Sequence, residues 1–326
     1  MKKILSLFFT AVLCTMGCQP DALIEPAGEV SLAKPLVRKC AANDVLQQQL
    51  AADPTLRQRM DQIEQFTAHA IKTNATARLV NGVIEIPVVV HVLYRLASEN
   101  ISDAQVQSQI DILNEDFNNT NADRNTVPAE FTDEQTSVGV RFVLDRIIRK
   151  YSSKRDWRYN DDMKKTSKGG SDPVDPSQYL NAWVVNKISY QGSYLFGFGQ
   201  FPGGNPATDG IVVGHKFWGR TGVVAFPYDK GRTATHEVGH WLNLRHIWGD
   251  ATCGDDLVSD TPVHNTSNFG CPTYPHKSTC AGTPTEMTVN YMDYTDDGCM
   301  VMFTNGQKSR MLAVFAPGGP RASFAQ

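Results

Sequence analysis

The chain has 326 residues, 41% of them hydrophobic, so it is long enough to bury a full core in one or two domains. Its formal net charge of −3 includes no basic surplus of the kind that nucleic-acid-binding proteins carry, so we expect no nucleic-acid partner. No internal apolar run approaches the roughly 20 residues that a membrane-spanning helix needs.

The start of the chain, 1–18, has the pattern of a secretory signal peptide. Two lysines precede an apolar segment, 4–13, that is too short to be a membrane helix. Small residues then lead to Cys18, as in a bacterial lipobox, although Thr15 stands where Leu is usual. We therefore expect export, either as an ordinary secreted protein or as a surface lipoprotein with a lipid anchor on Cys18.

The next part, 19–78, differs in composition from the rest of the chain. Residues 19–35 have little pattern and are typical of a linker, whereas 43–72 has helical periodicity, which Pro54 divides into two helices. A segment between a signal peptide and the main domain of an exported protein has the position of a pro-segment. We expect an activating protease to release it by cutting after a basic residue, and Arg78 is the candidate.

The remainder, 79–326, has the patterns of one α+β domain. An amphipathic helix is predicted over 102–118, with Ser102 and Gln105 as its capping box. Strands are predicted over 83–94, 138–148, 182–189 and 211–214. A polar surface excursion is expected over 151–178 and a loop over 192–206. This order predicts a twisted mixed sheet with a backing helix and a second helix near 232–242.

That second helix carries the motif H-E-x-x-H. His236 and His240 are four residues apart and therefore project from one helix face, where both imidazoles can bind one Zn²⁺. Glu237 is then placed to take a proton from water at the open position of the metal. His246 is the simplest third ligand if the chain turns after the helix, and Asn243 tolerates the left-handed backbone of such a turn.

Other interpretations of these residues were weighed. An H-E-x-x-H can be a solvated helix face, and a zinc site can be structural, but structural sites usually have four protein ligands and often use Cys. A downstream Glu as third ligand is a further alternative, and Glu286 is the only Glu after Glu237. A non-catalytic zinc-binding surface lipoprotein is the remaining one. His91 is expected to be a packed core histidine, and His215 is a weak metal candidate.

Four stretches carry a resemblance to a known family. They are 236–250 with the three histidines, 289–311 with a Met-turn, 86–94 and 101–121. On these the chain resembles the pappalysin family of metzincin metalloproteases, in its bacterial branch. The resemblance implies a zinc endopeptidase of proteins or peptides, with a cleft between an upper sheet-bearing part and an irregular C-terminal subdomain. Asn243 departs from the family pattern, which has Gly there.

The resemblance also implies roles for residues outside the helix. Met292 would form an apolar floor under the three imidazoles, and Tyr294 would donate to the oxyanion of the reaction. Asp296 and Asp297 are candidates for a pocket that prefers Arg or Lys after the cut bond; a surface turn is the alternative. Latent metzincins place a pro-segment cysteine on the metal, and Cys40 is the candidate here; the alternative is a Cys without a role.

After His246 the sequence is rich in loops and cysteines. Four cysteines follow His246, at positions 253, 271, 280 and 299. In an exported chain such an even set predicts two disulfides, for which the sequence alone allows three pairings. A second zinc site is the alternative, but the usual C-x₂-C spacing is absent. The resemblance implies the pairs Cys253–Cys280 and Cys271–Cys299.

A short acidic loop lies just behind the first of these cysteines. Asp255, Asp256 and Asp260 supply hard oxygen ligands at short spacing, which suits Ca²⁺ in an extracellular protein. The resemblance points the same way. A solvated acidic turn is the alternative.

Overall fold

The structure is a computed structural model that describes residues 36–75, 83–190 and 193–325. The expected signal peptide with Cys18, the linker 19–35 and Arg78 lie outside the described residues. From Val37 onward the chain forms one unit. None of its described helices is long and apolar enough to cross a membrane.

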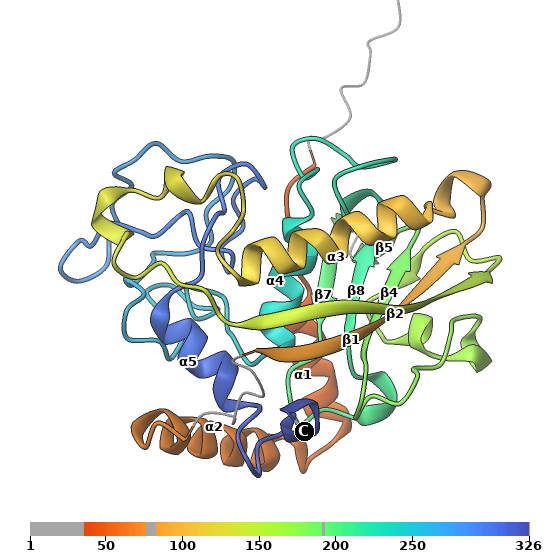
Figure 1. Cartoon of the computed structure of the whole chain (residues 1–326), viewed down its shortest axis with the longest axis horizontal. Helices are drawn as coiled ribbons and strands as arrows, with labels where there is room; N and C mark the ends of the chain where they lie inside the picture. Colours follow the sequence, from red (N-terminus) through yellow and green to blue (C-terminus); the bar gives the residue numbers. More distant parts are fainter. Residues whose placement is uncertain (1–35, 76–82, 191–192, 326) are drawn as a thin grey trace, which may run out of the picture. The chain divides into compact units, whose positions relative to one another are not determined.

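A five-stranded mixed sheet forms the centre of this unit, in the order β2-β1-β4-β8-β7 (Figure 1). The strands are β1 (Ile84–Tyr94), β2 (Val140–Tyr151), β4 (Leu180–Val185), β7 (Gly197–Gly199) and β8 (Ile211–Gly214). Four of them are parallel and β7 is antiparallel to β8. All residues of β4 and β8 are buried, as expected for Val- and Ile-rich strands covered on both faces. β7 and β2 are the two edge strands.

Helix α3 (Asp103–Phe117) lies along β2 and is the predicted backing helix (Figure 1). The hydroxyl of Ser102 accepts a hydrogen bond from the backbone N–H of Gln105 at 3.1 Å, so the expected N-cap is present. The reciprocal half of the box is absent, because the Gln105 amide donates instead to the backbone oxygens of His215 and Trp218. This helix is thus tied to the loop after β8 by its first turn.

Helix α4 (Arg232–Trp241) packs against β7, β8 and α3, and every one of its residues is buried. Arg232 at its start forms a buried ion pair with Asp116 of α3, whose second carboxylate oxygen accepts from Thr235 at 2.6 Å. These charges are paired, as buried charges must be. α4 is therefore held rigidly under the sheet.

The segment before the sheet forms two helices, α1 (Ala42–Ala52) and α2 (Leu56–Lys72), on either side of Pro54 as predicted. α1 contacts β7, whereas α2 packs on the last helix, α5 (Asn305–Ala313), as Figure 1 also shows. Helix α5 begins with a capping box between Thr304 and Gln307.

Three expectations about the sheet-bearing part were incomplete. The loop predicted over 192–206 contains β6 (Ser193–Leu195) and β7, and the strand predicted over 182–189 is divided into β4 and β5 (Ile188–Tyr190). Strands β3 (Trp157–Arg158), β5 and β6 form a second, small sheet. The excursion 151–178 is not wholly superficial either, since Trp157 and Met163 pack in a second hydrophobic cluster. Short strands with Gly or aromatic residues carry too little periodicity to be recognised.

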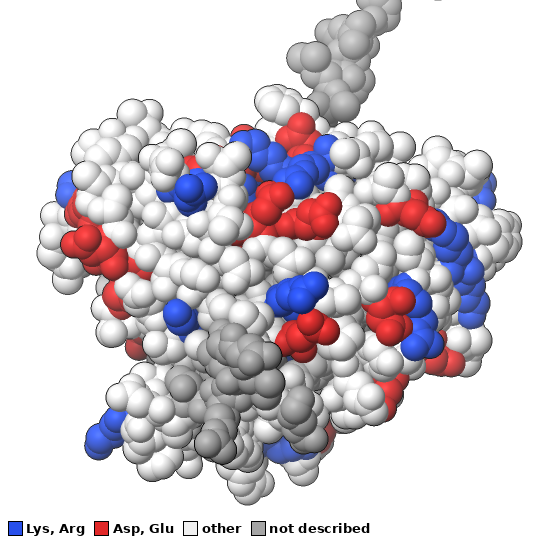
Figure 2. Space-filling model, in the orientation of Figure 1, with Lys and Arg blue, Asp and Glu red and all other residues white. Residues whose placement is uncertain are grey.

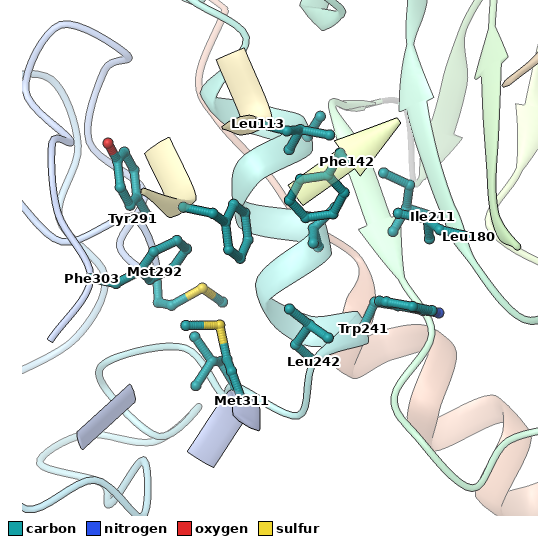
Figure 3. Packing of buried hydrophobic residues seen from close by; sticks show 14 of the residues in the cluster. Leu113, Phe142, Leu180, Ile211, Trp241, Leu242, Tyr291, Met292, Phe303 and Met311 are labelled. Atoms are coloured by element: carbon teal, nitrogen blue, oxygen red, sulfur yellow. The ribbon is translucent and has the colours of Figure 1, made fainter. Parts of the chain in front are cut away.

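Between α4 and α5 the chain has turns and isolated bridges but neither helix nor strand, so the C-terminal part is irregular as predicted. Its apolar side chains join the main core around the end of α4, where Leu242, Met292 and Met311 meet (Figure 3). On the outside, Figure 2 shows Lys and Arg interspersed with Asp and Glu over the face drawn.

Candidate active site

The three histidines of the motif converge on one point. The Nε2 atom of His240 lies 3.2 Å from Nε2 of His236 and 3.1 Å from Nε2 of His246. Two nitrogens bound to one tetrahedral Zn²⁺ at 2.0–2.1 Å are about 3.3 Å apart, so the spacing suits such an ion. The three rings and the Cys40 thiol form the only cluster of metal-ligand side chains found among the described residues.

The second ring nitrogens fix how the imidazoles are protonated. Nδ1 of His236 donates to the carbonyl oxygen of Tyr291 at 2.7 Å, and Nδ1 of His240 donates to that of Leu244 at 2.8 Å. Each Nε2 must then present its lone pair to the shared point. Burial lowers the pKa of His236 well below its ordinary value and that of His240 to about 3, which favours these neutral forms. Such an arrangement fits a bound cation.

The turn after α4 brings the third histidine back. The chain leaves the helix at Leu242, and Asn243 adopts the left-handed conformation with φ 73°. The amide of Leu244 closes the turn on the carbonyl of Gly239 at 2.9 Å. Asn in place of Gly therefore keeps the turn, at the modest cost of a non-glycine residue with positive φ.

Asp250 is a member of the site that the sequence did not identify. Its Oδ1 lies 2.5 Å from Nδ1 of His246 and sets the orientation of that ring. The ring also stacks on Trp248, with 4.3 Å between the ring centroids. A carboxylate four residues beyond the third histidine was a visible signal. The missing information was the backbone, because Asp250 has a left-handed conformation, with φ 57°, that its residue type does not require.

Glu237 lies beside the histidines with almost no exposure. A Cβ on Gly199 would come within 2.3 Å of its carbonyl oxygen, and a Cβ on Gly197 within 2.9 Å of its carboxylate, so β7 approaches α4 this closely only with glycine at both positions. Burial raises the pKa of Glu237 to about 8. The Cys40 thiol donates to its carboxylate at 3.3 Å.

Residues 292 and 294 lie where the Met-turn was expected. Met292 is fully buried, and its sulfur packs so closely on α4 that a Cβ on Gly239 would lie 2.5 Å from it. The Tyr294 hydroxyl lies 3.2 Å from Nε2 of His246 and also contacts the backbone of Cys40. Burial raises the pKa of Tyr294 well above its ordinary value, so the phenol keeps its proton.

The two aspartates that follow have different surroundings. Asp297 is fully buried and forms an ion pair with Arg38, while its second oxygen accepts from the backbone N–H of Lys230 at 2.8 Å. Asp296 is only partly buried and neighbours the Tyr228 phenol. Asp297 therefore holds the Arg38 guanidinium, whereas Asp296 lies beside Tyr228. Their role in a specificity pocket stays a prediction.

Arg38, the ion-pair partner of Asp297, was not singled out from the sequence. Its Nε donates to the carbonyl oxygen of Thr295 at 3.1 Å, and its Nη1 donates to the Thr233 hydroxyl at 3.2 Å. The guanidinium also lies 5.3 Å from the centre of the Tyr228 ring. Because Arg38 and Asp297 are 259 residues apart in sequence, no local pattern could have paired them.

Disulfides join Cys253 to Cys280 and Cys271 to Cys299, the pairs that the resemblance implies. Cys40 is the free cysteine among the described residues. The backbone N–H of the next residue, Ala41, donates to the carbonyl oxygen of Gly197 at 3.1 Å. Cys40 thus pairs with the edge strand β7 in a parallel bridge.

The acidic loop does not form a cluster of three carboxylates. Asp260 accepts from the Thr304 hydroxyl and the Gly306 amide, each at 2.7 Å, and so caps the first turn of α5. Asp256 accepts from Thr261 within its own loop, and Asp255 is exposed. Calcium binding here stays a prediction.

The weaker candidates lie elsewhere. His91 is buried against Trp183 as a core histidine, and its two ring nitrogens are hydrogen-bonded with Ser171 and Asn181. His215 bonds the carbonyl of Asn186 and is outside the metal cluster. Glu286, also outside it, accepts hydrogen bonds from Asn265 and Asn268.

Fold and site together are those of a metzincin-type zinc metalloprotease, and comparisons with known proteins agree. The model of the peptidase M43 family, described as pregnancy-associated plasma protein-A, matches residues 165–316. An extracellular metalloprotease of Arthroderma benhamiae is 33% identical over 246 residues, which cover 73% of this chain and 79% of that relative. One of Arthroderma otae is 32% identical over 255 residues, covering 74% and 81%.

Solved structures are similar over the same region. Mature mirolysin of Tannerella forsythia, in complex with a cleaved peptide, is 42% identical with a TM-score of 0.70, and covers 74% of this chain and 95% of its own. A promirolysin mutant of that organism is 39% identical with a TM-score of 0.78, and covers 88% and 97%. The chain therefore belongs to the M43, or pappalysin, family of zinc metalloproteases, whose matched relatives are extracellular.

Proposed function

We propose that this extracellular metalloprotease is made as a latent endopeptidase, with its own N-terminal segment occupying the cleft, and that it prefers Arg or Lys after the cut bond. The observation that carries the proposal is the convergence of three imidazole lone pairs beside a buried carboxylate, with Cys40 over the same point. Endopeptidase activity, rather than mere zinc binding, follows from the retained Glu237.

The roles of the side chains follow from their positions. His236, His240 and His246 hold the zinc ion, which when bound polarises the scissile carbonyl and makes water more acidic. Glu237 accepts a proton from the attacking water and passes it to the leaving amine. Tyr294, which keeps its proton, donates a hydrogen bond to the oxyanion.

The general base is tested by Glu237→Ala in the mature enzyme. We expect zinc content to stay at one ion per chain while peptide cleavage is lost, because the three imidazoles are unchanged. Glu115→Ala, which removes a partly exposed carboxylate of α3 that is paired with Arg220 away from the histidines, is the control and should retain activity. Full activity of Glu237→Ala would contradict the role of Glu237 as general base. The third zinc ligand is tested by His246→Ala, in which an unchanged zinc content would exclude His246 as a ligand.

Latency is proposed from the contacts of Cys40. Its thiol lies against Glu237, its backbone holds the Tyr294 hydroxyl, and its neighbour pairs with β7, so three parts of the machinery are occupied at once. The pro-form of mirolysin matches a larger share of this chain than the mature form does, 88% against 74%. This supports 19–78 as a pro-segment and cleavage near Arg78.

Latency is tested by Cys40→Ala in the full chain. We expect peptidase activity to appear before any N-terminal cleavage, since a methyl group cannot bind zinc. Cys40→Ser is the conservative comparison and should be intermediate. A wild-type full chain as active as the mature enzyme would contradict latency itself.

Specificity is proposed from the side chains and carbonyl groups that surround Arg38. A buried carboxylate, two hydroxyl or carbonyl acceptors and an aromatic ring surround the guanidinium, which is the chemistry that selects arginine. A substrate side chain of the same kind would take this place after activation. Peptide-library cleavage should give Arg or Lys after the cut bond, and Asp297→Asn should reduce that preference at least tenfold.

The remaining features are export, anchoring and calcium. We propose a signal peptide at 1–18, with a lipid anchor on Cys18 tested by metabolic labelling with palmitate against Cys18→Ser. Calcium at the loop of Asp255, Asp256 and Asp260 is tested by a calcium-dependent rise in melting temperature, and loss of that rise in Asp256→Asn. The N-terminus of the mature enzyme, read by mass spectrometry, tests Arg78.

A further inference from the structure

Helix α2 docks on the turn that carries the third histidine. The amide Nδ2 of Asn243 lies 3.4 Å from the hydroxyl of Thr67, a residue of α2 that has no exposed surface. Gly at 243 would suit φ 73° at least cost but has no side chain to offer. The asparagine thus adds a contact to the N-terminal segment that glycine cannot make.

A second, charged contact lies next to it. Arg310 of α5 is buried, and its Nε donates to the carbonyl oxygen of Asn243 at 2.7 Å. Its Nη2 donates to the carboxylate of Glu64 on α2 at 2.5 Å. Arg245, two residues beyond Asn243, lies 3.9 Å from the same carboxylate. Glu64 therefore bridges two arginines that flank the turn.

The first turns of α2 contact the loop that follows β7. The guanidinium of Arg59 donates to the carbonyl of Gly203 at 3.0 Å, and a Cβ on Gly203 would meet the end of Ile63 at 2.8 Å. These contacts belong to a helix that begins sixteen residues after Cys40, and they involve none of the groups that Cys40 and Arg38 contact.

We propose that the surface formed by Asn243, Arg245 and Arg310 is a dedicated docking site for α2, and that this contact is a second anchor that keeps the N-terminal segment closed. The proposal rests on the latency proposed above. The anchor acts on the turn between His240 and His246 rather than in the cleft. The docking site binds a helix face that presents a carboxylate, that of Glu64, and a hydroxyl three residues further on, that of Thr67.

The test measures opening without using activity. The exported full chain carries Glu237→Ala to prevent self-cleavage, and the rate at which a small disulfide reagent modifies Cys40 is followed by mass spectrometry of the peptide that contains it. Glu64→Gln and Asn243→Gly are added separately. The control is Asp61→Asn, which removes an exposed carboxylate of α2 one turn earlier.

We expect Glu64→Gln to raise the modification rate about tenfold, equivalent to about 1.4 kcal/mol, and Asn243→Gly to raise it less, with zinc content and melting temperature nearly unchanged in both. Asp61→Asn should match the parent. If Cys40 were modified in both Glu64→Gln and Asn243→Gly at the rate of the parent chain, the second anchor would be overturned. It would also be overturned if modification became faster only where the whole fold was lost. A parent chain modified as fast as in urea would instead overturn latency.

Discussion

Asp250 is predicted to hold His246 in position for zinc. Its carboxylate contacts Nδ1 of the ring at 2.5 Å, and its side chain is a quarter exposed, so water screens the pair only in part. Carboxylates behind metal-bound histidines typically contribute 10- to 100-fold in affinity. Asp250→Asn keeps an acceptor and loses the charge, so we expect about tenfold weaker zinc binding, or about 1.4 kcal/mol. Asp250→Ala loses both, and we expect a decrease near 100-fold.

The assay is competition for zinc with a fluorescent chelator, performed on the metal-free chain. Asp145→Asn, which alters a carboxylate paired with its neighbour Arg146 on β2, is the control and should bind zinc as the parent does. Melting temperatures of the zinc-loaded forms check that the fold persists. If Asp250→Ala bound zinc as tightly as the parent, the orienting role would be refuted.

Three further predictions concern the active site and the acidic loop. Tyr294→Phe in the mature enzyme should lower kcat by about 10² with little change in KM, because an oxyanion donor acts in the transition state; a change in KM alone would contradict this. In EGTA, the free energy of unfolding should fall as pH rises from about 4, the unfolded pKa of Asp, to about 7, because burial raises the pKa of Asp256 to about 7 and the fold retains a proton that the unfolded chain releases. Asp256→Asn should remove this part of the slope in urea titrations, and equal slopes would argue against it. Zinc added to the metal-free chain at 100 times its Kd should stabilise the fold by about 2.7 kcal/mol; a melting temperature insensitive to zinc would contradict a preformed site.

Local spacing was enough to predict the centre of the site. Two histidines four apart on a helix share a face whatever the rest of the chain does, and Asn243 signalled the turn that returns His246. The helices around Pro54 and the N-cap at Ser102 were predicted from equally local signals. The long apolar strand β1 was recognised because its period and length are clear.

Contacts between distant segments could not be predicted in this way. Arg38 and Asp297 meet only after the chain has folded, and so do Glu64 and Arg310. β7 has three residues, two of them Gly, and its identity as a strand comes from pairing with β8 rather than from propensity. Gln105 was assigned to a capping box, but tertiary partners took its side chain instead.

The edge strand β7 has a consequence for the choice of targets. It borders Glu237 with glycines at 197 and 199, so it offers a neighbouring peptide mainly its main-chain N–H and C=O groups. A polypeptide can use those groups only if its own are free, which excludes segments already locked in helices or sheets. Such an enzyme would select proteins by local conformation first, and would cut in segments that are flexible enough to adopt an extended conformation.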